Sequence, residues 1–278
     1  MNNIMVSISM ITYNHEKYIQ KAIESVLMQK TNFDYELLIH DDASTDKTAD
    51  IIKKFESEYP NIIKPIYQME NQYSKNVKIS YTYNFTRAKG KYIALCEGDD
   101  YWIDPLKIQK QVDYLEDNSN CPMCFHAADK VNENGVVFGQ IKPSLFDCNC
   151  SVEDIMCRKI ICPTASIIFR KKLVETIPDF MMKCPVGDYP LELYLASKGD
   201  LRYLADKMSA YRYGHVDSWT QKTFHSVDSK QKAYKFALSI ISTSLQIIYI
   251  KMPLIKNKKG WNLIHSYGLK TINSYEKI

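Results

Sequence analysis

The chain has 278 residues, of which 45% are hydrophobic, and its 36 basic and 32 acidic residues give a formal net charge of +4. This length and apolar content suit one large globular domain, or two small ones, with a substantial core. The charge balance is too mild to indicate a nucleic-acid partner, and no apolar run reaches the length of a membrane-spanning helix.

The start of the chain and its cysteines indicate a compartment. The first residues lack a charged leader region and pass directly into an apolar run, so we expect no signal peptide. The 8 cysteines then indicate reduced thiols and a cytoplasmic location. Structural zinc at Cys121, Cys124, Cys148 and Cys150 is an alternative to free thiols.

Strand and helix patterns alternate over the first 117 residues. The strand patterns are at 4–11, 35–40, 62–67 and 92–96, and the helical patterns are at 18–27, 51–55, 77–88 and 106–115. The last of these helices should begin at Asp104, an N-cap residue followed by Pro105. This alternation predicts an α/β fold with a mostly parallel sheet and right-handed crossovers.

The patterns change after residue 117. Apolar runs at 123–127 and 131–138 flank Asn134-Gly135, which predicts an antiparallel hairpin. A capping box at 151–154 should open a short helix, a strand is expected at 164–169, and a helix at 191–195 can end at Gly199. The second half is therefore a smaller mixed region.

The C-terminal segment is basic. Beyond position 226 the only acidic residues are Asp228 and Glu276, against 9 lysines, and apolar residues are interspersed. We expect residues 226–278 to form a mainly helical extension. It either binds an anionic membrane surface or packs on the domain with its lysines in solvent.

Three carboxylates follow the buried strand pattern at 92–96, namely Glu97, Asp99 and Asp100. Open α/β sheets bind ligands at the carboxyl ends of their strands. Like charges at such an edge repel, and a divalent cation with hard oxygen ligands neutralises them. The alternative is a solvated acidic turn before the next helix.

Further polar residues are expected at the same edge of the sheet. Thr12, Tyr13 and Asn14 follow the first strand, and Asp42 follows the second. Such groups can bind the base and ribose of a nucleoside. No glycine-rich dinucleotide or P-loop signature is present, so hydride transfer and P-loop hydrolysis are not indicated.

The order and spacing of these motifs resemble glycosyltransferase family 2, whose members have the GT-A fold. The matching segments are 6–14, 22–29, 41–46 and, in place of the family's DxD region, 97–102. The resemblance covers roughly residues 4–215 and is strongest up to about residue 117. It implies a GT-A type fold with a Rossmann-like sheet flanked by helices, and inverting sugar transfer from a nucleotide-sugar donor.

The resemblance also implies roles for individual residues. Thr12, Tyr13 and Asn14 would contact the nucleotide, Asp42 the base, and Asp99 the ribose or a metal.

A divalent metal, Mn²⁺ or Mg²⁺, would be bound by Asp99 and Asp100, with Glu97 and His215 as further candidate ligands. The sequence departs from the family in having Glu97 where Asp often stands and Ala43 where Gly is common.

Asp188 is the expected catalytic base. The segment 186–195 resembles the family's Glu-Asp-Tyr segment near the acceptor, with Gly187 replacing the usual Glu. A carboxylate there can accept the proton of the attacking hydroxyl. The alternative is that Asp188 only caps its helix. Arg212 or His215 would lie near the diphosphate.

Together these expectations describe a metal-dependent transferase that uses a nucleotide sugar, expected to be a UDP-sugar. Its acceptor would be a saccharide or lipid-linked molecule in cell-surface polysaccharide or glycolipid biosynthesis, at the inner face of the membrane. The GT-A domain would span 1–225, with a donor half at 1–117 and an acceptor half at 118–225. The alternatives are a non-catalytic nucleotide-sugar binding or scaffold protein, and a hydrolase with paired carboxylates.

Overall fold

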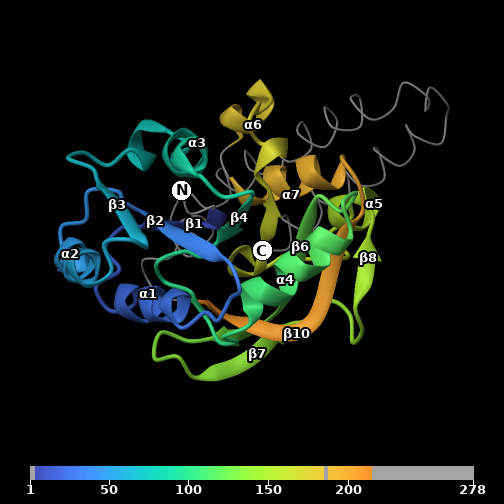
Figure 1. The fold of residues 1–278 in the computed structure, drawn as a ribbon, viewed down its shortest axis with the longest axis horizontal. Coiled ribbons are helices and arrows are strands. Elements are labelled where there is room, and N and C mark those ends of the chain that lie inside the picture. The colour runs from blue at the N-terminus through green and yellow to red at the C-terminus, as the bar shows by residue number, and fades with distance from the viewer. Residues whose placement is uncertain (1–3, 185–186, 215–278) are drawn as a thin grey trace, which may run out of the picture.

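A computed structural model describes residues 4–184 and 187–214 (Figure 1). Its strands form one 10-stranded mixed sheet. The strands are β1 (Ile4–Thr12), β2 (Asp34–Asp41), β3 (Ile63–Tyr67), β4 (Tyr92–Leu95), β5 (Tyr101–Trp102), β6 (Met123–Val131), β7 (Val137–Ile141), β8 (Cys148–Cys150), β9 (Ile168–Arg170) and β10 (Leu201–Arg212).

The helices lie between these strands. They are α1 (Ile19–Leu27), α2 (Thr48–Glu58), α3 (Phe85–Arg87), α4 (Lys107–Asp117), α5 (Val152–Met156), α6 (Asp179–Lys183) and α7 (Asp188–Ala196). Short 3₁₀ turns are present at Tyr73–Lys75, Thr164–Ser166 and Lys171–Leu173, and a π-helical turn at Ser80–Asn84 precedes α3.

The first half of the chain forms the parallel part of the sheet. The strand order is β3-β2-β1-β4-β9-β6-β10-β5, with β7 beside β6 and β8 beside β10. Neighbours from β3 to β4 are parallel, β9 is antiparallel to β4 and β6, and β10 is parallel to β6. The predicted α/β fold, with a parallel half and a smaller mixed half, is confirmed.

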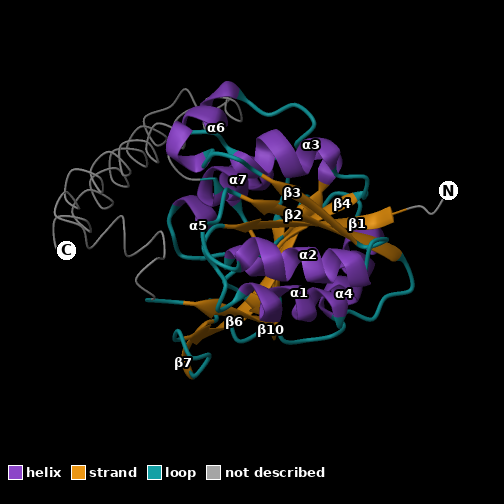
Figure 2. Ribbon diagram, turned by 90° about the vertical axis from the view of Figure 1, so that its left-hand side faces the viewer, coloured by secondary structure: helices purple, strands orange, loops and turns teal. Residues whose placement is uncertain are grey.

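Helices cover both faces of the sheet (Figure 2). Apolar side chains of α1 and α4 pack on one face, where Ile8, Ile39 and Trp102 are buried. Side chains of α5, α6 and α7 pack on the other face, around Phe125 and Phe169. The strands in the centre are therefore apolar on both sides, as continuous apolar runs such as 92–95 predict.

Several predicted boundaries shift by a few residues. The antiparallel hairpin is present, with its turn around Gly135 at φ +79°, and Ser151 and Asp154 form the expected capping box at α5. The helix expected over 77–88 is instead the π-helical turn followed by one turn of α3. The helix expected at Asp104 begins at Lys107, because the Asp104 carboxylate accepts the N–H of Leu106 in a turn before it.

The longest strand, β10, was not expected from the sequence. It pairs with β6 along its length and with β8 and β5 at its two ends. Its register against β6 shifts twice, around Lys207. The exposed pair Asp206 and Lys207 interrupts the apolar pattern at this point, which removes the periodicity by which a strand is recognised.

The described residues contain all of the cysteines, and they can be searched for a zinc site and for membrane-spanning helices. Of the 8 cysteines, 6 are buried. Within 4–184 and 187–214, no three His, Cys, Asp or Glu side chains are arranged to hold a metal, so the zinc alternative gains no support.

None of the helices described is long and apolar enough to cross a membrane. The domain boundary at 225 and the extension 226–278 lie outside the described residues and stay predictions.

Candidate active site

The carboxyl ends of β1, β2 and β4 meet at one edge of the sheet, because these strands are parallel neighbours. Thr12 ends β1, and the loop with Glu97 to Asp100 follows β4. The N–H of Gly98 donates to the carbonyl of Ile11 at 2.9 Å, which brings this loop against β1. A Cβ on Gly98 would lie 2.7 Å from Thr12 Oγ1, so only glycine allows this approach.

The loops after β1 and β2 bind each other. The N–H of Asn14 donates to Ser44 Oγ at 2.9 Å, and Asn14 Oδ1 accepts the N–H of Thr45 at 2.8 Å. Thr12 is buried, and its Oγ1 has no hydrogen-bond partner among the described residues. Tyr13 is 39% exposed. The three residues expected at the nucleotide therefore present a buried hydroxyl, an accessible ring and an amide that orders the loop.

Asp42 is buried and already engaged. Its two carboxylate oxygens accept the N–H groups of Gln72 and Tyr73 at 2.8 and 3.0 Å. His40 Nε2 lies 3.6 Å from Asp42 Oδ1, and burial lowers the pKa of His40. Each oxygen of Asp42 keeps a further lone pair for a ligand N–H. Asp42 therefore orders the 68–76 loop beside the position expected for the base.

Glu97, Asp99 and Asp188 interact electrostatically although Asp188 is far away in the chain. Burial, together with the nearby charges of Asp99 and Asp188, raises the pKa of Glu97 to about 8. Asp188, the first residue of α7, is exposed, and its Oδ1 accepts the N–H of Tyr189 at 2.8 Å. Asp188 therefore lies close enough to the carboxylates after β4 for its charge to affect Glu97.

Asp100 has a structural partner and a vacant oxygen. Its Oδ1 accepts the N–H of Arg212 at 2.7 Å, whereas its buried Oδ2 has no partner in the described part of the chain. Burial, with the charge of Asp99, raises the pKa of Asp100 above its ordinary range. An unpartnered buried oxygen beside Asp99 fits a cation in chemical terms.

The residues present could give a divalent cation only part of its coordination shell. No group of three His, Cys, Asp or Glu side chains within the described ranges could hold a metal alone. Mg²⁺ is commonly held by one or two carboxylates together with substrate phosphates and water. Asp99 and Asp100, with Glu97 beside them, fit that arrangement. His215 lies outside the described residues.

Two residues near the site, Glu192 and Tyr81, were not predicted from the sequence. Glu192 lies one helical turn after Asp188, and burial raises its pKa to about 8. Its signal was a carboxylate within an otherwise apolar helix. The hydroxyl of Tyr81 donates to the carbonyl of Gly187 at 3.0 Å, and no sequence pattern around either residue predicts this contact. Trp102, which ends β5 after the site carboxylates, is a core residue: it is buried and donates from Nε1 to the carbonyl of Ala165.

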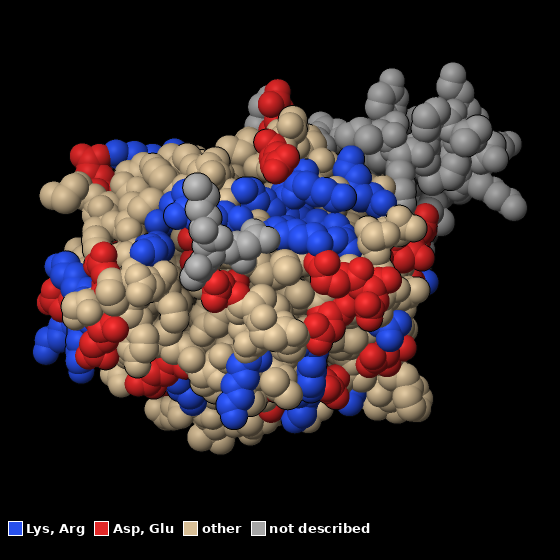
Figure 3. Space-filling view, in the orientation of Figure 1, with Lys and Arg blue, Asp and Glu red and all other residues tan. Residues whose placement is uncertain are grey.

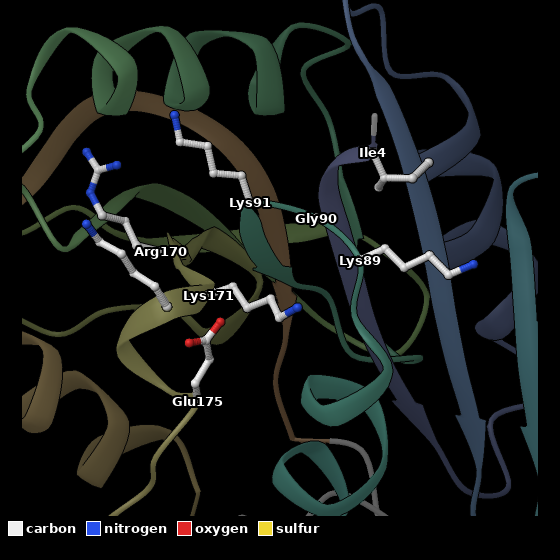
Figure 4. A pocket seen from close by; sticks show the side chains of 8 residues that line it. Ile4, Lys89, Gly90, Lys91, Arg170, Lys171 and Glu175 are labelled. Atoms are coloured by element: carbon white, nitrogen blue, oxygen red, sulfur yellow. The ribbon is translucent and has the colours of Figure 1, made fainter. Parts of the chain in front are cut away.

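A basic pocket of about 290 Å³ lies at the opposite edge of the sheet, near the starts of β1 and β4. Figure 4 shows its lining, in which Lys89, Lys91, Arg170 and Lys171 surround an opening above Glu175. Lys and Arg side chains also form a band across the face seen in Figure 3. None of the site carboxylates lines this pocket, so it is separate from the candidate active site.

Several known proteins are similar to this chain in sequence. An uncharacterized protein of Mycobacterium tuberculosis is 36% identical over 208 residues, which are 74% of this chain and 58% of that protein. The chain thus spans little more than half the length of that relative. The Escherichia coli UDP-Glc:alpha-D-GlcNAc-diphosphoundecaprenol beta-1,3-glucosyltransferase WfaP is 38% identical over 112 residues, 40% of this chain and 41% of that enzyme.

Solved structures share the fold. Staphylococcus aureus TarS 1–349 in complex with UDP matches with a TM-score of 0.61 and 15% identity, covering 98% of this chain and 89% of that one. The mannosyltransferase PcManGT from Pyrobaculum calidifontis, in complex with GDP-Man and Mn²⁺, matches with a TM-score of 0.55 and 14% identity, covering 98% and 82%. At such identities the likeness concerns the fold alone.

A family model covers the greater part of the described chain. The model for glycosyl transferase family 2 matches residues 7–173, which include most of β1, the loop after β2 and the carboxylates after β4. With the fold and the sequence relatives, this match shows that the chain belongs to glycosyl transferase family 2.

Proposed function

We propose that the chain transfers a sugar from a nucleotide-sugar donor to a hydroxyl of a saccharide or lipid-linked acceptor, with inversion at the anomeric carbon. The observation that carries the proposal is the convergence of the loops after β1, β2 and β4 at one edge of the sheet, where the N–H of Gly98 donates to the carbonyl of Ile11. The effect of the Asp188 charge on Glu97 at this edge supports a base beside the donor carboxylates. Family membership supports the same reaction class.

The donor nucleotide is proposed to lie over the ends of β1 and β2. Thr12, Tyr13 and Asn14 would contact the nucleoside, Asp42 the base and Asp99 the ribose or the cation. The order imposed by the Asn14 contacts and by Asp42 supports this placement, since a preorganised loop loses little entropy on binding. UDP is the proposed nucleotide, in keeping with the TarS complex and the name of WfaP.

The proton is proposed to pass to Asp188. As the acceptor oxygen bonds to the anomeric carbon, the bond from that carbon to the diphosphate oxygen breaks, and the hydroxyl proton moves to the Asp188 carboxylate. The nucleoside diphosphate leaves with the bonding pair. Exposure of Asp188 at the start of α7 supports this role, because an acceptor can reach it.

A divalent cation, Mn²⁺ or Mg²⁺, is proposed to be bound by Asp99 and Asp100, with Glu97 beside them. When bound, it would stabilise negative charge on the leaving diphosphate. The vacant Oδ2 of Asp100 supports this assignment, as does the Mn²⁺ complex of PcManGT.

We place the reaction in cell-surface polysaccharide or glycolipid assembly, on the cytoplasmic side of the membrane. The diphosphoundecaprenol acceptor in the name of WfaP supports a lipid-linked acceptor. Contact with an anionic membrane through residues 226–278 belongs to this proposal and concerns residues outside those described.

A thermal-shift panel of UDP-, GDP- and dTDP-sugars, each with and without Mn²⁺, tests the proposal. A ligand that binds the folded state raises its apparent stability by mass action, so the matching donor should raise the Tm more with metal than without it. Release of nucleoside diphosphate from that donor then separates an enzyme from a non-catalytic binding protein. Absence of a shift with every donor would refute the proposal.

A further inference from the structure

Arg212, the last residue of β10, donates hydrogen bonds to three backbone carbonyls. Its Nε donates to the carbonyl of Asp99 at 2.9 Å, and its Nη1 donates to those of Asn132 and Glu133 at 2.7 and 2.8 Å. Its backbone N–H donates to Asp100 Oδ1 at 2.7 Å. The side chain is 5% exposed. One residue thus joins the loop of Asp99 and Asp100 to the hairpin turn between β6 and β7.

The guanidinium plane is also supported by aromatic rings. The Cζ of Arg212 lies 4.3 Å from the ring centroid of Tyr18, which precedes α1, and 5.8 Å from that of Tyr101. A planar guanidinium can stack on a ring while its edge donates to several fixed acceptors. Lysine, whose ammonium is a compact point charge, cannot satisfy the same set.

We propose that Arg212 is a positioning residue for the donor site: it sets the affinity for a nucleoside diphosphate by holding the backbone of Asp99 and the carboxylate of Asp100. This inference rests on the proposed function. The sequence suggested a contact of Arg212 with the diphosphate itself. The three carbonyls that accept from Nε and Nη1 argue for the indirect role.

The hydrogen bonds explain why this residue would control the loop. Glu97, Asp99 and Asp100 repel one another, so the loop that carries them needs compensating contacts to keep one conformation. Arg212 supplies a positive charge and two contacts, one to each of Asp99 and Asp100. Losing the side chain removes the hydrogen bond to the Asp99 carbonyl, although the backbone N–H still donates to Asp100, and should allow the loop to move before any donor arrives.

Arg170 is a matched control within the same chain. It is 6% exposed and, like Arg212, donates to several protein acceptors. These are the carbonyls of Cys121, Leu115 and Asn118 and the hydroxyl of Tyr92. It lines the basic pocket at the opposite edge of the sheet. Replacing either arginine removes comparable buried hydrogen bonds, but only Arg212 contacts the carboxylate loop.

The test compares Arg212→Lys with Arg170→Lys in the full chain. Hydrogen exchange of the ligand-free proteins is measured for peptides covering residues 97–103, and affinities for UDP and GDP with Mn²⁺ are measured by calorimetry. We expect both variants to lose thermal stability. Arg212→Lys alone should speed exchange in 97–103 by about tenfold and weaken nucleotide binding by about tenfold, the effect of losing one charge-assisted hydrogen bond.

If Arg212→Lys does not fold, Tyr18→Leu provides a second test, because it removes the ring beneath the guanidinium. It should also speed exchange in 97–103 and weaken nucleotide binding.

The outcomes separate the alternatives. Weaker nucleotide binding with unchanged exchange in 97–103 would mean direct contact with the diphosphate and overturn the positioning role. Equal effects of Arg212→Lys and Arg170→Lys would overturn it as well, because they would reflect general destabilisation. Failure of the wild-type chain to bind UDP or GDP, together with no thermal shift with dTDP-sugars, would refute the proposed function, whereas the exchange experiment on the ligand-free proteins would still test Arg212.

Discussion

The hydroxyl of Tyr81 donates a hydrogen bond of 3.0 Å to the carbonyl oxygen of Gly187, the residue before Asp188. Tyr81 is buried in the π-helical turn before α3, with its ring edge-on to Phe85. Burial, and then the charge of Asp188, raise the pKa of Tyr81, so the hydroxyl stays a donor at all physiological pH values. This contact joins the start of α7, and thus the proposed base, to the half of the chain that carries the proposed donor site.

Replacing Tyr81 by Phe should therefore lower turnover more than donor affinity. The change removes one hydrogen bond, which costs about 1 kcal/mol of stability, and frees the start of α7. Misplacement of Asp188 should reduce the rate of nucleoside diphosphate release by about tenfold, with donor affinity within about twofold of wild type. Tyr203→Phe is the control, since the Tyr203 hydroxyl donates to the carbonyl of Ser144 at 3.1 Å. Equal loss of rate in both variants would count against a specific role for Tyr81.

Ala43 has a left-handed backbone, with φ at +64°, in the turn after β2. This conformation costs an L-residue about 1–2 kcal/mol, and glycine avoids that cost but loses about 0.5–1 kcal/mol through its more flexible unfolded state. Ala43→Gly should thus raise the free energy of unfolding by up to about 1.5 kcal/mol. Ala49→Gly in α2 should have the opposite sign, because glycine disfavours helix. Urea unfolding of both variants gives the comparison, and destabilisation by Ala43→Gly would contradict the assignment of strain.

Lys107 should give the protein a pH-dependent stability. It is fully buried, donates to Gln111 Oε1 at 2.8 Å, and lies 4.2 Å from the Trp102 ring centroid. Burial lowers its pKa to about 7. An unfolded lysine has a pKa near 10.4, so between about pH 7 and 10 the unfolded chain binds a proton that the folded chain has lost. The free energy of unfolding should then rise with pH in this window by up to about 1.4 kcal/mol per unit.

Lys107→Met removes this titration. Urea unfolding at several pH values between 7 and 9.5 should show a smaller rise with pH for the variant than for wild type, and the difference between the two cancels other titrating groups. The free energy of unfolding of the variant should exceed that of wild type most at the lowest pH, because there the charged form of Lys107 must be buried in the folded wild-type protein. Parallel curves would mean that Lys107 keeps an ordinary pKa in the folded protein.

Patterns within short segments predicted the first half of the fold. The apolar runs of β1, β2 and β4 are continuous because these strands are covered on both faces, and each is followed by polar residues at the same edge. From this pattern the sequence predicts that Thr12, Asp42 and Asp99 lie at one edge of the sheet, because each follows the carboxyl end of a parallel strand. The family resemblance added Asp188.

Contacts between distant segments could not be predicted in this way. Arg212 and Asp100 are 112 residues apart, and Tyr81 and Gly187 are 106 apart. These contacts involve mainly backbone groups, which every residue type has, so the residue types do not indicate them. The strand that brings Arg212 to the site, β10, bends through two register shifts and so lacks the regular alternation of apolar residues.

The central claim is that Asp188 is the base of a nucleotide-sugar transferase, and Asp188→Asn tests it most directly. The measurement is release of nucleoside diphosphate from the donor found in the thermal-shift panel, together with the Kd of that donor. The amide cannot accept the proton of the attacking hydroxyl, so release should fall by about 10²- to 10⁴-fold. Because Asp188 is exposed at the start of α7, the Kd should stay within about twofold of wild type. Release near the wild-type rate, with the donor bound normally, would contradict the account.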